Sequence, residues 1–138
     1  MNALEFTLDL RPMSGNAFWG RSGNRTYITA KGREWRKYIQ KNLKELIGLG
    51  MLRPFPFDCR LGMSYKFHFK GIRKVDTSNY IKCLEDTFQK EIDKKTGKIL
   101  NEGAYLYDND EQVDEIRAKR VYNASYDFID VKIWEIEK

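Results

Sequence analysis

Histidine and cysteine are scarce in this chain, which contains one histidine and two cysteines among 138 residues. The cysteines, Cys59 and Cys83, lack the close spacing of metal-binding pairs, so we expect buried, free thiols of an intracellular protein. The single histidine, His68, falls on the polar face of a predicted strand, where a surface role is the more common one. This scarcity argues against a disulfide scaffold, a zinc site built from cysteine and histidine, and histidine-based catalysis.

Long apolar runs are also missing, because no stretch approaches the ~20 apolar residues that cross a bilayer. The N-terminal residues alternate and include acidic side chains, unlike a signal peptide. Hydrophobic residues nevertheless make up 41% of the chain and aromatic residues 14%, which favours a folded core over disorder. We therefore expect one domain over residues 1–138, located in the cytoplasm and without membrane association.

Charge is unevenly distributed along the chain, whose net charge is +5. Residues 1–75 hold 15 Lys/Arg against 5 Asp/Glu, and residues 76–115 hold 5 against 11. A basic surface suits a phosphate backbone, because each neutralised phosphate releases condensed counterions. The acidic stretch is either a solvated surface or, together with a divalent cation, a site that acts on the phosphodiester. Charge alone leaves both interpretations open.

The hydrophobic pattern predicts a single α/β (α+β) domain with a mixed sheet of about four strands and two main helices. Alternating apolar residues predict strands over residues 4–10, 59–69, 113–122 and 127–137. Helical spacing predicts helices over residues 31–49 and 77–93. Residues 11–29 have no period and predict a long loop, and residues 94–107 predict a second loop with room for a short hairpin.

The second predicted helix combines an apolar stripe with a polar one. Successive residues advance by about 100°, which gathers four apolar side chains on one side: Ile81, Leu84, Phe88 and Ile92. Three polar side chains lie on the other side: Asn79, Lys82 and Asp86. Asp76 and Ser78 lie at the start of the helix, where side-chain oxygens cap free amides. The pattern is more typical of an ordinary N-cap with a Lys82–Asp86 pair, and the entrance to a catalytic site is the alternative interpretation.

A second acidic segment, Asp108-Asn109-Asp110-Glu111, lies just before the strand predicted at residues 113–122. In one interpretation these acidic residues belong to a solvated turn. In the functional interpretation, Asp110 approaches Asp76 and their carboxylates hold Mg²⁺, which prefers oxygen ligands. The ion would polarise a phosphoryl oxygen and activate water, while a nearby lysine neutralises developing charge or protonates the leaving group.

Three segments of the chain resemble the RusA family of Holliday-junction resolvases. They are R-P-M-S-G-N-A-F-W-G-R-S-G-N-R-T-Y-I-T-A-K-G-R-E-W-R-K from Arg11, Asp76-x-x-Asn79-x-x-Lys82 with Asp86, and Asp108-Asn109-Asp110-Glu111-Gln112-Val113. They occur in the family's order and cover nearly the whole chain. The resemblance implies a homodimeric endonuclease, often encoded by prophages, that cuts branched four-way DNA with Mg²⁺, or Mn²⁺, and needs no organic cofactor.

The resemblance also implies roles for individual residues. Asp76, Lys82 and Asp110 match catalytic positions, and Asp76 and Asp110 match metal ligands. Further candidate ligands are Ser78, Asp86 and Asp108. We expect DNA contacts from polar and basic residues of the first segment and from those around the second: Arg11, Ser14, Asn16, Arg21, Arg25, Lys31, Arg73, Lys74 and Asn79.

Two departures from the family pattern bear on activity. Ser78 stands where the family usually has a second aspartate, so either Asp86 or Asp108 compensates, or the protein binds junctions or other nucleic acid with impaired catalysis. In addition, 23 residues separate Asp86 from Asp110, more than in the family's usual connection. The additional residues 94–103 either alter DNA contacts or extend the dimer interface.

Overall fold

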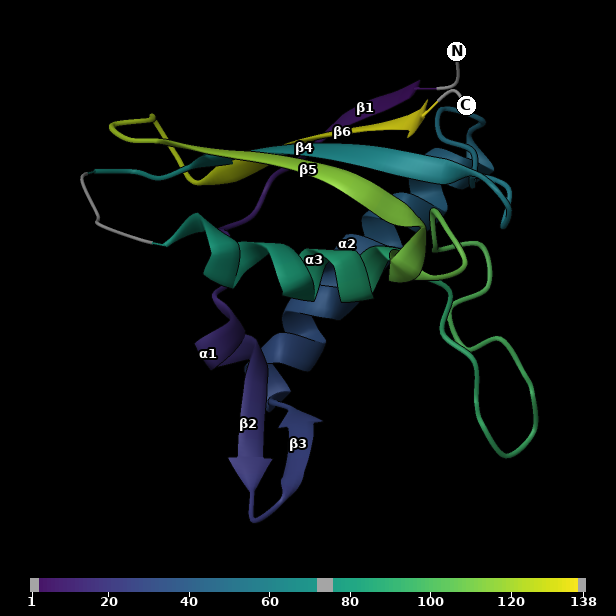
Figure 1. The fold of residues 1–138 in the computed structure, drawn as a ribbon. Coiled ribbons are helices and arrows are strands. Elements are labelled where there is room, and N and C mark those ends of the chain that lie inside the picture. Colours follow the sequence, from purple (N-terminus) through teal and green to yellow (C-terminus); the bar gives the residue numbers. More distant parts are fainter. Residues whose placement is uncertain (1–2, 72–75, 137–138) are drawn as a thin grey trace.

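The computed structural model describes residues 3–71 and 76–136. They form a sheet with helices against one of its faces (Figure 1). The sheet has the strand order β1-β6-β4-β5, with bounds Ala3–Leu8 for β1, Phe128–Ile136 for β6, Arg60–His68 for β4 and Val113–Val121 for β5. β6 is antiparallel to both β1 and β4, whereas β4 and β5 are parallel. The predicted mixed four-stranded sheet is thus confirmed.

Alternation along β4 fixes the sheet's register. Leu61, Met63, Tyr65 and Phe67 are buried against the helices, and Tyr65 pairs with the equally buried Val131 of β6. A one-residue slip would turn this apolar set toward solvent, so the core determines the pairing. Both cysteines are buried free thiols, as expected.

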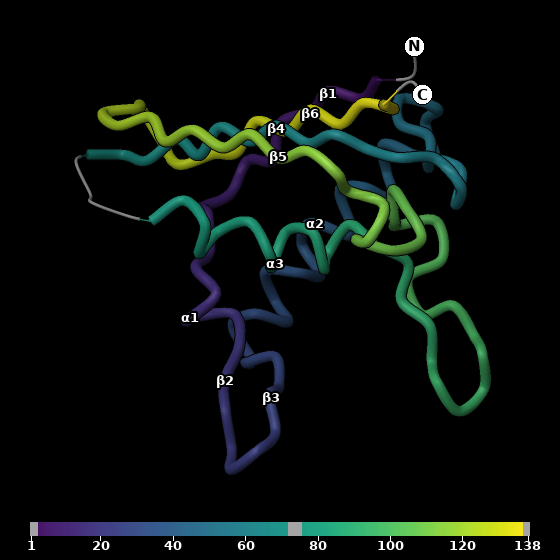
Figure 2. The backbone as a smooth tube through the Cα atoms, in the orientation of Figure 1, coloured from purple at the N-terminus to yellow at the C-terminus, as the bar shows by residue number. Residues whose placement is uncertain are grey.

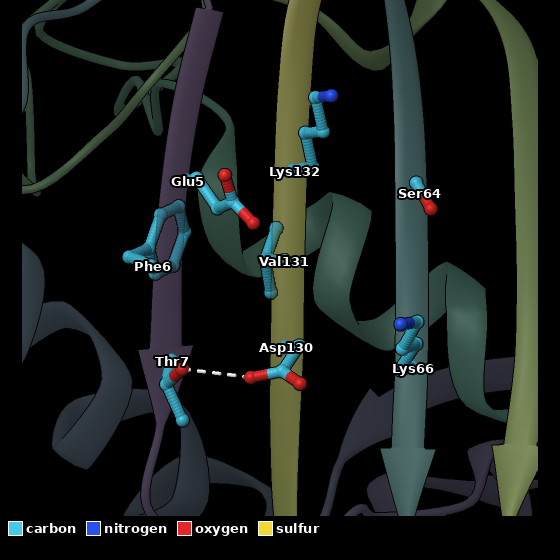
Figure 3. Close-up of a pocket in the computed structure, with 8 residues that line it drawn as sticks. All are labelled: Glu5, Phe6, Thr7, Ser64, Lys66, Asp130, Val131 and Lys132. Carbon is cyan, nitrogen blue, oxygen red and sulfur yellow. Dashed lines mark hydrogen bonds between the residues drawn. The ribbon is translucent and has the colours of Figure 1, made fainter.

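The opposite face of the sheet is polar and lies away from the helices (Figure 3). It forms a shallow pocket of about 340 Å³, in which Thr7 Oγ1 donates a 2.7 Å hydrogen bond to Asp130. His68 lies on this face as predicted, stacked on Phe128 and 2.9 Å from the second oxygen of Asp130. Lys66 and Lys132 also border the pocket. We call this surface the open sheet face.

Helix α2, Ala30–Gly48, is confirmed within a residue of its predicted bounds. It begins after Thr29, whose Oγ1 accepts a 3.0 Å hydrogen bond from the backbone N–H of Gly32 and so caps the first turn. Its apolar stripe, including Trp35, Ile39 and Leu43, is buried in the core beneath the sheet.

The second helix is shorter than predicted. It consists of a 3₁₀ turn, η1 (Thr77–Tyr80), followed by α3 (Ile81–Phe88). Leu84 and Phe88 are buried as expected, but Ile92 is 51% exposed, so the prediction of a helix to residue 93 is wrong. Backbone bonds from a distant segment replace the last helical turn: Leu106 N–H donates to Phe88 O and Lys90 N–H donates to Tyr107 O.

Residues 11–29 are not the loop that the sequence predicted. They contain α1 (Gly15–Phe18) and a hairpin of β2 (Trp19–Ser22) and β3 (Arg25–Ile28), which projects away from the sheet (Figures 1 and 2). The two-residue turn requires a positive φ of 61° at Gly23, which glycine adopts readily. The Tyr27 ring lies so close over Gly20 that a Cβ there would be 2.5 Å from the ring.

The segment between α3 and β5 is largely irregular, as predicted, and ends in the 3₁₀ turn η2, Asp110–Gln112. Within residues 3–71 and 76–136, no helix combines the length and apolar character needed to cross a membrane.

Candidate active site

Lys82 in α3 joins two carboxylates that come from different elements. Its Nζ donates a hydrogen bond to Asp110 Oδ2 in η2 and lies 3.6 Å from Asp86 Oδ1, one helical turn away. The side chains of Asp86 and Asp110 are 25% and 23% exposed, and that of Lys82 is 58% exposed. Three of the predicted site residues therefore meet at a partly open point of the surface.

A buried glutamine holds the segment that carries Asp110. Gln112, 3% exposed, accepts hydrogen bonds at Oε1 from the N–H groups of Asp108 and Asn109, and its Nε2 donates to Pro56 O and Cys59 O. The Asn109 side chain caps the start of η2 by accepting a hydrogen bond from Glu111 N–H. This capping box was visible in the sequence as Asn109-x-x-Gln112, and its positioning role is an addition to the predicted site.

Gln89 fixes the same turn to α3, because its Oε1 accepts a 3.0 Å hydrogen bond from Asp110 N–H. Gln89 directly follows the last residue of α3. Asp110 therefore lies beside the end of that helix. No local pattern indicates this contact, since Gln89 falls within the helix that the spacing predicts to residue 93.

Charges in the site influence one another. Burial by itself lowers the pKa of Lys82, but its hydrogen bond to Asp110 and the charges of Asp86 and Asp110 raise the pKa overall, so the ammonium form is favoured. Burial raises the pKa of Asp86 and brings that of Glu85 to about 7, in each case opposed by Lys82. Glu85 was not among the predicted residues. The site thus concentrates negative charge around one ammonium group.

Asp76 lies elsewhere, at the beginning of η1. Its Oδ1 accepts hydrogen bonds from Ser78 N–H at 3.1 Å and Ser78 Oγ at 2.7 Å, and these bonds hold the pKa of the Asp76 carboxyl below its usual range. η1 precedes α3, whereas Asp110 contacts Lys82 in the first turn of α3 and Gln89 just after its last residue, so Asp76 lies before the helix and Asp110 lies alongside it (Figure 1).

The Asp76 carboxylate is thus hydrogen-bonded to Ser78, and the Asp110 carboxylate to Lys82. In the part of the chain that the structure describes, no group of three or more His, Cys, Asp or Glu is arranged to hold a metal ion. The roles of Asp76 and Asp110 as shared metal ligands stay a prediction.

A cleft of about 750 Å³ opens at the Asp76 end of α3. It is lined by six of the predicted site residues: Arg11, Ser14, Asn16, Lys31, Asp76 and Asn79. The first loop is anchored here, since Trp35 Nε1 donates a 2.9 Å hydrogen bond to Arg11 O and Cys83 Sγ donates to Met13 O. Residues far apart in sequence are thus brought together as a polar, partly cationic cleft.

Among the described residues, three further predicted ones, Arg21, Arg25 and Asp108, belong neither to the Lys82 cluster nor to the lining of the cleft. Arg21 and Arg25 are exposed on the β2–β3 hairpin, and Arg73 and Lys74 fall outside the described residues. Asp108 forms an ion pair with Lys90 at 3.3 Å. Asp86, in contrast, contacts Lys82.

The fold and these two places define a class: a small, basic α/β protein with a lysine–carboxylate site and a polar cleft on the helical side of a mixed sheet. The chain belongs to the RusA endodeoxyribonuclease family, whose model matches residues 9–134. It is also similar to the crossover junction endodeoxyribonuclease rusA of Enterobacteria phage HK97, at 29% identity over 137 residues, 99% of this chain and 98% of the phage protein. The family inferred from the three motifs is confirmed.

Proposed function

We propose that this chain is a Mg²⁺-dependent, structure-specific endonuclease that resolves Holliday junctions as a homodimer in the cytoplasm. The observation that carries this proposal is the contact of Lys82 with both Asp86 and Asp110, at the surface of a chain that belongs to the RusA family. We expect Mn²⁺ to support cleavage in place of Mg²⁺, and no organic cofactor to be needed.

The chemistry of the donors fits a divalent cation. Asp86 and Asp110 come from different elements and already share one cationic group, the Lys82 ammonium. Mg²⁺ in nucleotide-processing sites is commonly bound by one or two carboxylates and keeps several waters, so two carboxylates are enough. When bound, the ion supplies polarisation of the scissile phosphoryl group and an activated water.

In this proposal Lys82 turns from the carboxylates to the DNA. Asp86 and Asp110 would hold a divalent cation, and the Lys82 ammonium would then be free to neutralise charge that develops on the phosphoryl oxygens. Its 58% exposed side chain has the freedom to do so.

Asp76 keeps its proposed catalytic role, with Ser78 beside it. It lines the cleft, so a DNA strand that follows η1 and α3 would contact first the cleft and then the Lys82–Asp110 pair. DNA contacts are proposed from the cleft, the hairpin and the basic pair before Asp76: Arg11, Ser14, Asn16, Lys31, Asn79, Arg21, Arg25, Arg73 and Lys74. A two-fold dimer would place paired sites on a junction of matching symmetry.

The test is cleavage of a synthetic four-way junction with Mg²⁺, compared with binding in EDTA. Wild-type protein is expected to nick opposing strands with Mg²⁺ and only to bind in EDTA. Lys82→Ala should lower the cleavage rate about 100-fold or more while binding changes little, because the lysine acts on charge in the transition state. Lys119→Ala, which removes one exposed lysine from β5, is the matched control and should cut normally.

A second candidate function is junction binding with impaired catalysis. Ser78 supports it, because a hydroxyl bonded to Asp76 replaces a charged ligand at that position. Binding without nicking at any Mg²⁺ or Mn²⁺ concentration would establish this alternative. Ser78→Asp should then restore or raise cleavage, whereas an unchanged rate in an active wild-type protein would mean that Asp86 already fills the role.

A further inference from the structure

Residues 89–107 form an ordered arm between α3 and η2, which we call the lysine arm. Its base is closed by a bridge between Gln89 and Tyr107, and its middle by an antiparallel bridge between Ile92 and Ile99. Two 2.8 Å backbone hydrogen bonds connect the two sides of the arm, from Leu100 N–H to Glu91 O and from Asp93 N–H to Lys98 O. The arm projects away from the sheet, on the same side as the β2–β3 hairpin (Figures 1 and 2).

Polar contacts hold the arm in place. The buried side chain of Asn101 accepts a 2.7 Å hydrogen bond from Glu91 N–H and donates a 2.9 Å bond to Gln89 O. Glu91 also forms a 3.0 Å ion pair with Arg36 of α2. A segment fixed in this way loses little conformational entropy when it binds a ligand.

The tip of the arm carries three exposed lysines, Lys94, Lys95 and Lys98. Among the ion pairs of the described residues, none involves these three, whereas Lys90 at the base is paired with Asp108. The one carboxylate at the tip, Asp93, accepts a hydrogen bond from Lys95 N–H. The tip therefore presents positive charge that ion pairs leave unused.

We propose that Lys94, Lys95 and Lys98 bind the phosphate backbone of a duplex arm of the junction. The inference rests on the proposed function. Lysine acts on phosphate as a mobile point charge without reading sequence, which suits a projecting tip with no shaped pocket. The lysine arm and the hairpin that bears Arg21 and Arg25 project from the helical side of the sheet, which also carries Lys82. DNA bound on that side meets both projections.

The experiment compares two triple variants of equal charge. In one, Lys94, Lys95 and Lys98 are changed to alanine. In the other, three exposed lysines of the open sheet face are changed to alanine: Lys66 and Lys132 (Figure 3), and Lys119, which pairs with Lys66 in the neighbouring strand β5. Dissociation constants for a four-way junction are measured in EDTA over a range of salt concentrations. The tip variant should bind roughly tenfold or more weakly at 0.1 M salt, with a log–log salt slope smaller by about 2 to 3, because each phosphate contact contributes about 0.9. The sheet-face variant should change much less.

Each other result overturns the inference. Equal losses in both variants would mean that net charge alone matters, and unchanged binding by a tip variant with wild-type melting would mean that the lysines do not touch DNA. A changed oligomeric state by light scattering, with unchanged DNA affinity, would instead assign the arm to contact between copies through its exposed Ile92 and Leu100. Wild-type protein that neither binds nor cuts junctions would reject the proposed function together with the inference. If wild-type protein is active and the tip variant still binds normally, only the inference about the lysine arm is rejected.

Discussion

The ammonium group of Lys82 donates a hydrogen bond to the carboxylate of Asp110, which lies 28 residues further along the chain. This contact joins α3 to the turn before β5 and brings two of the predicted catalytic residues together. Asp86 Oδ1 lies 3.6 Å from the same ammonium group, so removal of any one of the three charges changes the electrostatic environment of the other two.

Asp110→Asn should abolish metal-dependent cleavage and leave junction binding unchanged or tighter. The amide keeps the shape of the side chain but removes the negative charge that a divalent cation needs, and one fewer negative charge repels DNA less. Single-turnover cleavage and mobility-shift assays measure the two effects. Asp108→Asn is the control and should cut normally, since Asp108 is paired with Lys90 rather than with Lys82; the reverse order of the two variants would place the site around Asp108.

Asp76→Asn tests whether the carboxylate at the start of η1 takes part in the chemistry. An asparagine oxygen still accepts the bonds from Ser78, so the turn should be kept and the melting temperature should change little. We expect cleavage to be lost while binding is kept. Normal cleavage by this variant would confine the chemistry to the cluster of Lys82, Asp86 and Asp110.

Gln112→Ala should lower both stability and cleavage. The change leaves Pro56 O, Cys59 O and two backbone N–H groups without their side-chain partner, and each buried group left unsatisfied costs about 1–3 kcal/mol. Allowing for relaxation, we expect a loss of about 2–4 kcal/mol in the free energy of unfolding, measured in urea.

Gln40→Ala is the matched control for this variant. Its buried Nε2 has no hydrogen-bond partner within the described ranges, so its removal should cost far less. Similar losses in the two variants would mean that the Gln112 bonds do not hold the turn. Cleavage in the Gln112 variant should fall even at temperatures where it is fully folded, because Asp110 loses its support.

Asp114 should contribute to stability only above the acid range. Its hydrogen bond to Arg60, with Nε 3.0 Å from Oδ2, holds the pKa of the Asp114 carboxyl below its usual range. A depressed pKa in the folded state means that the stabilisation is present above the unfolded value of about 3.9 and is lost as the pH falls through the folded value. Melting curves of wild type and Asp114→Asn should therefore differ at neutral pH and converge at low pH. The difference should be small, because the pair is exposed, and a gap that persists at low pH would contradict the assignment.

Elements with strong periodicity were predictable from the sequence. The alternation from Cys59 to Phe69 gave β4 and its buried face, and the spacing of Trp35, Ile39 and Leu43 gave α2, because each pattern follows from a regular backbone with one side in the core. The three motifs gave the family, which the comparison confirms. Polar residues at fixed spacing, Lys82 and Asp86, also gave one contact of the site correctly.

Short and locally packed elements were not predictable in this way. The β2–β3 hairpin has mostly exposed residues, so no alternation marks it, and its signals are the turn glycine Gly23 and the Gly20–Tyr27 contact. The end of α3 was missed because helical spacing extends to Ile92. The helix ends at Phe88, whose carbonyl accepts a hydrogen bond from Leu106 N–H, and Lys90 N–H donates to Tyr107 O instead of continuing the helix.

The sequence by itself determined the layers of this protein and the residues available for chemistry, because burial of an apolar face constrains each strand and helix one by one. Only the tertiary structure decided where those residues meet. It placed Asp110 beside Lys82 through Gln89 and Gln112, and left Asp76 at the start of η1, where it lines the cleft. Distances between polar side chains on separate elements depend on how the whole core packs, and no local pattern of residues encodes that sum.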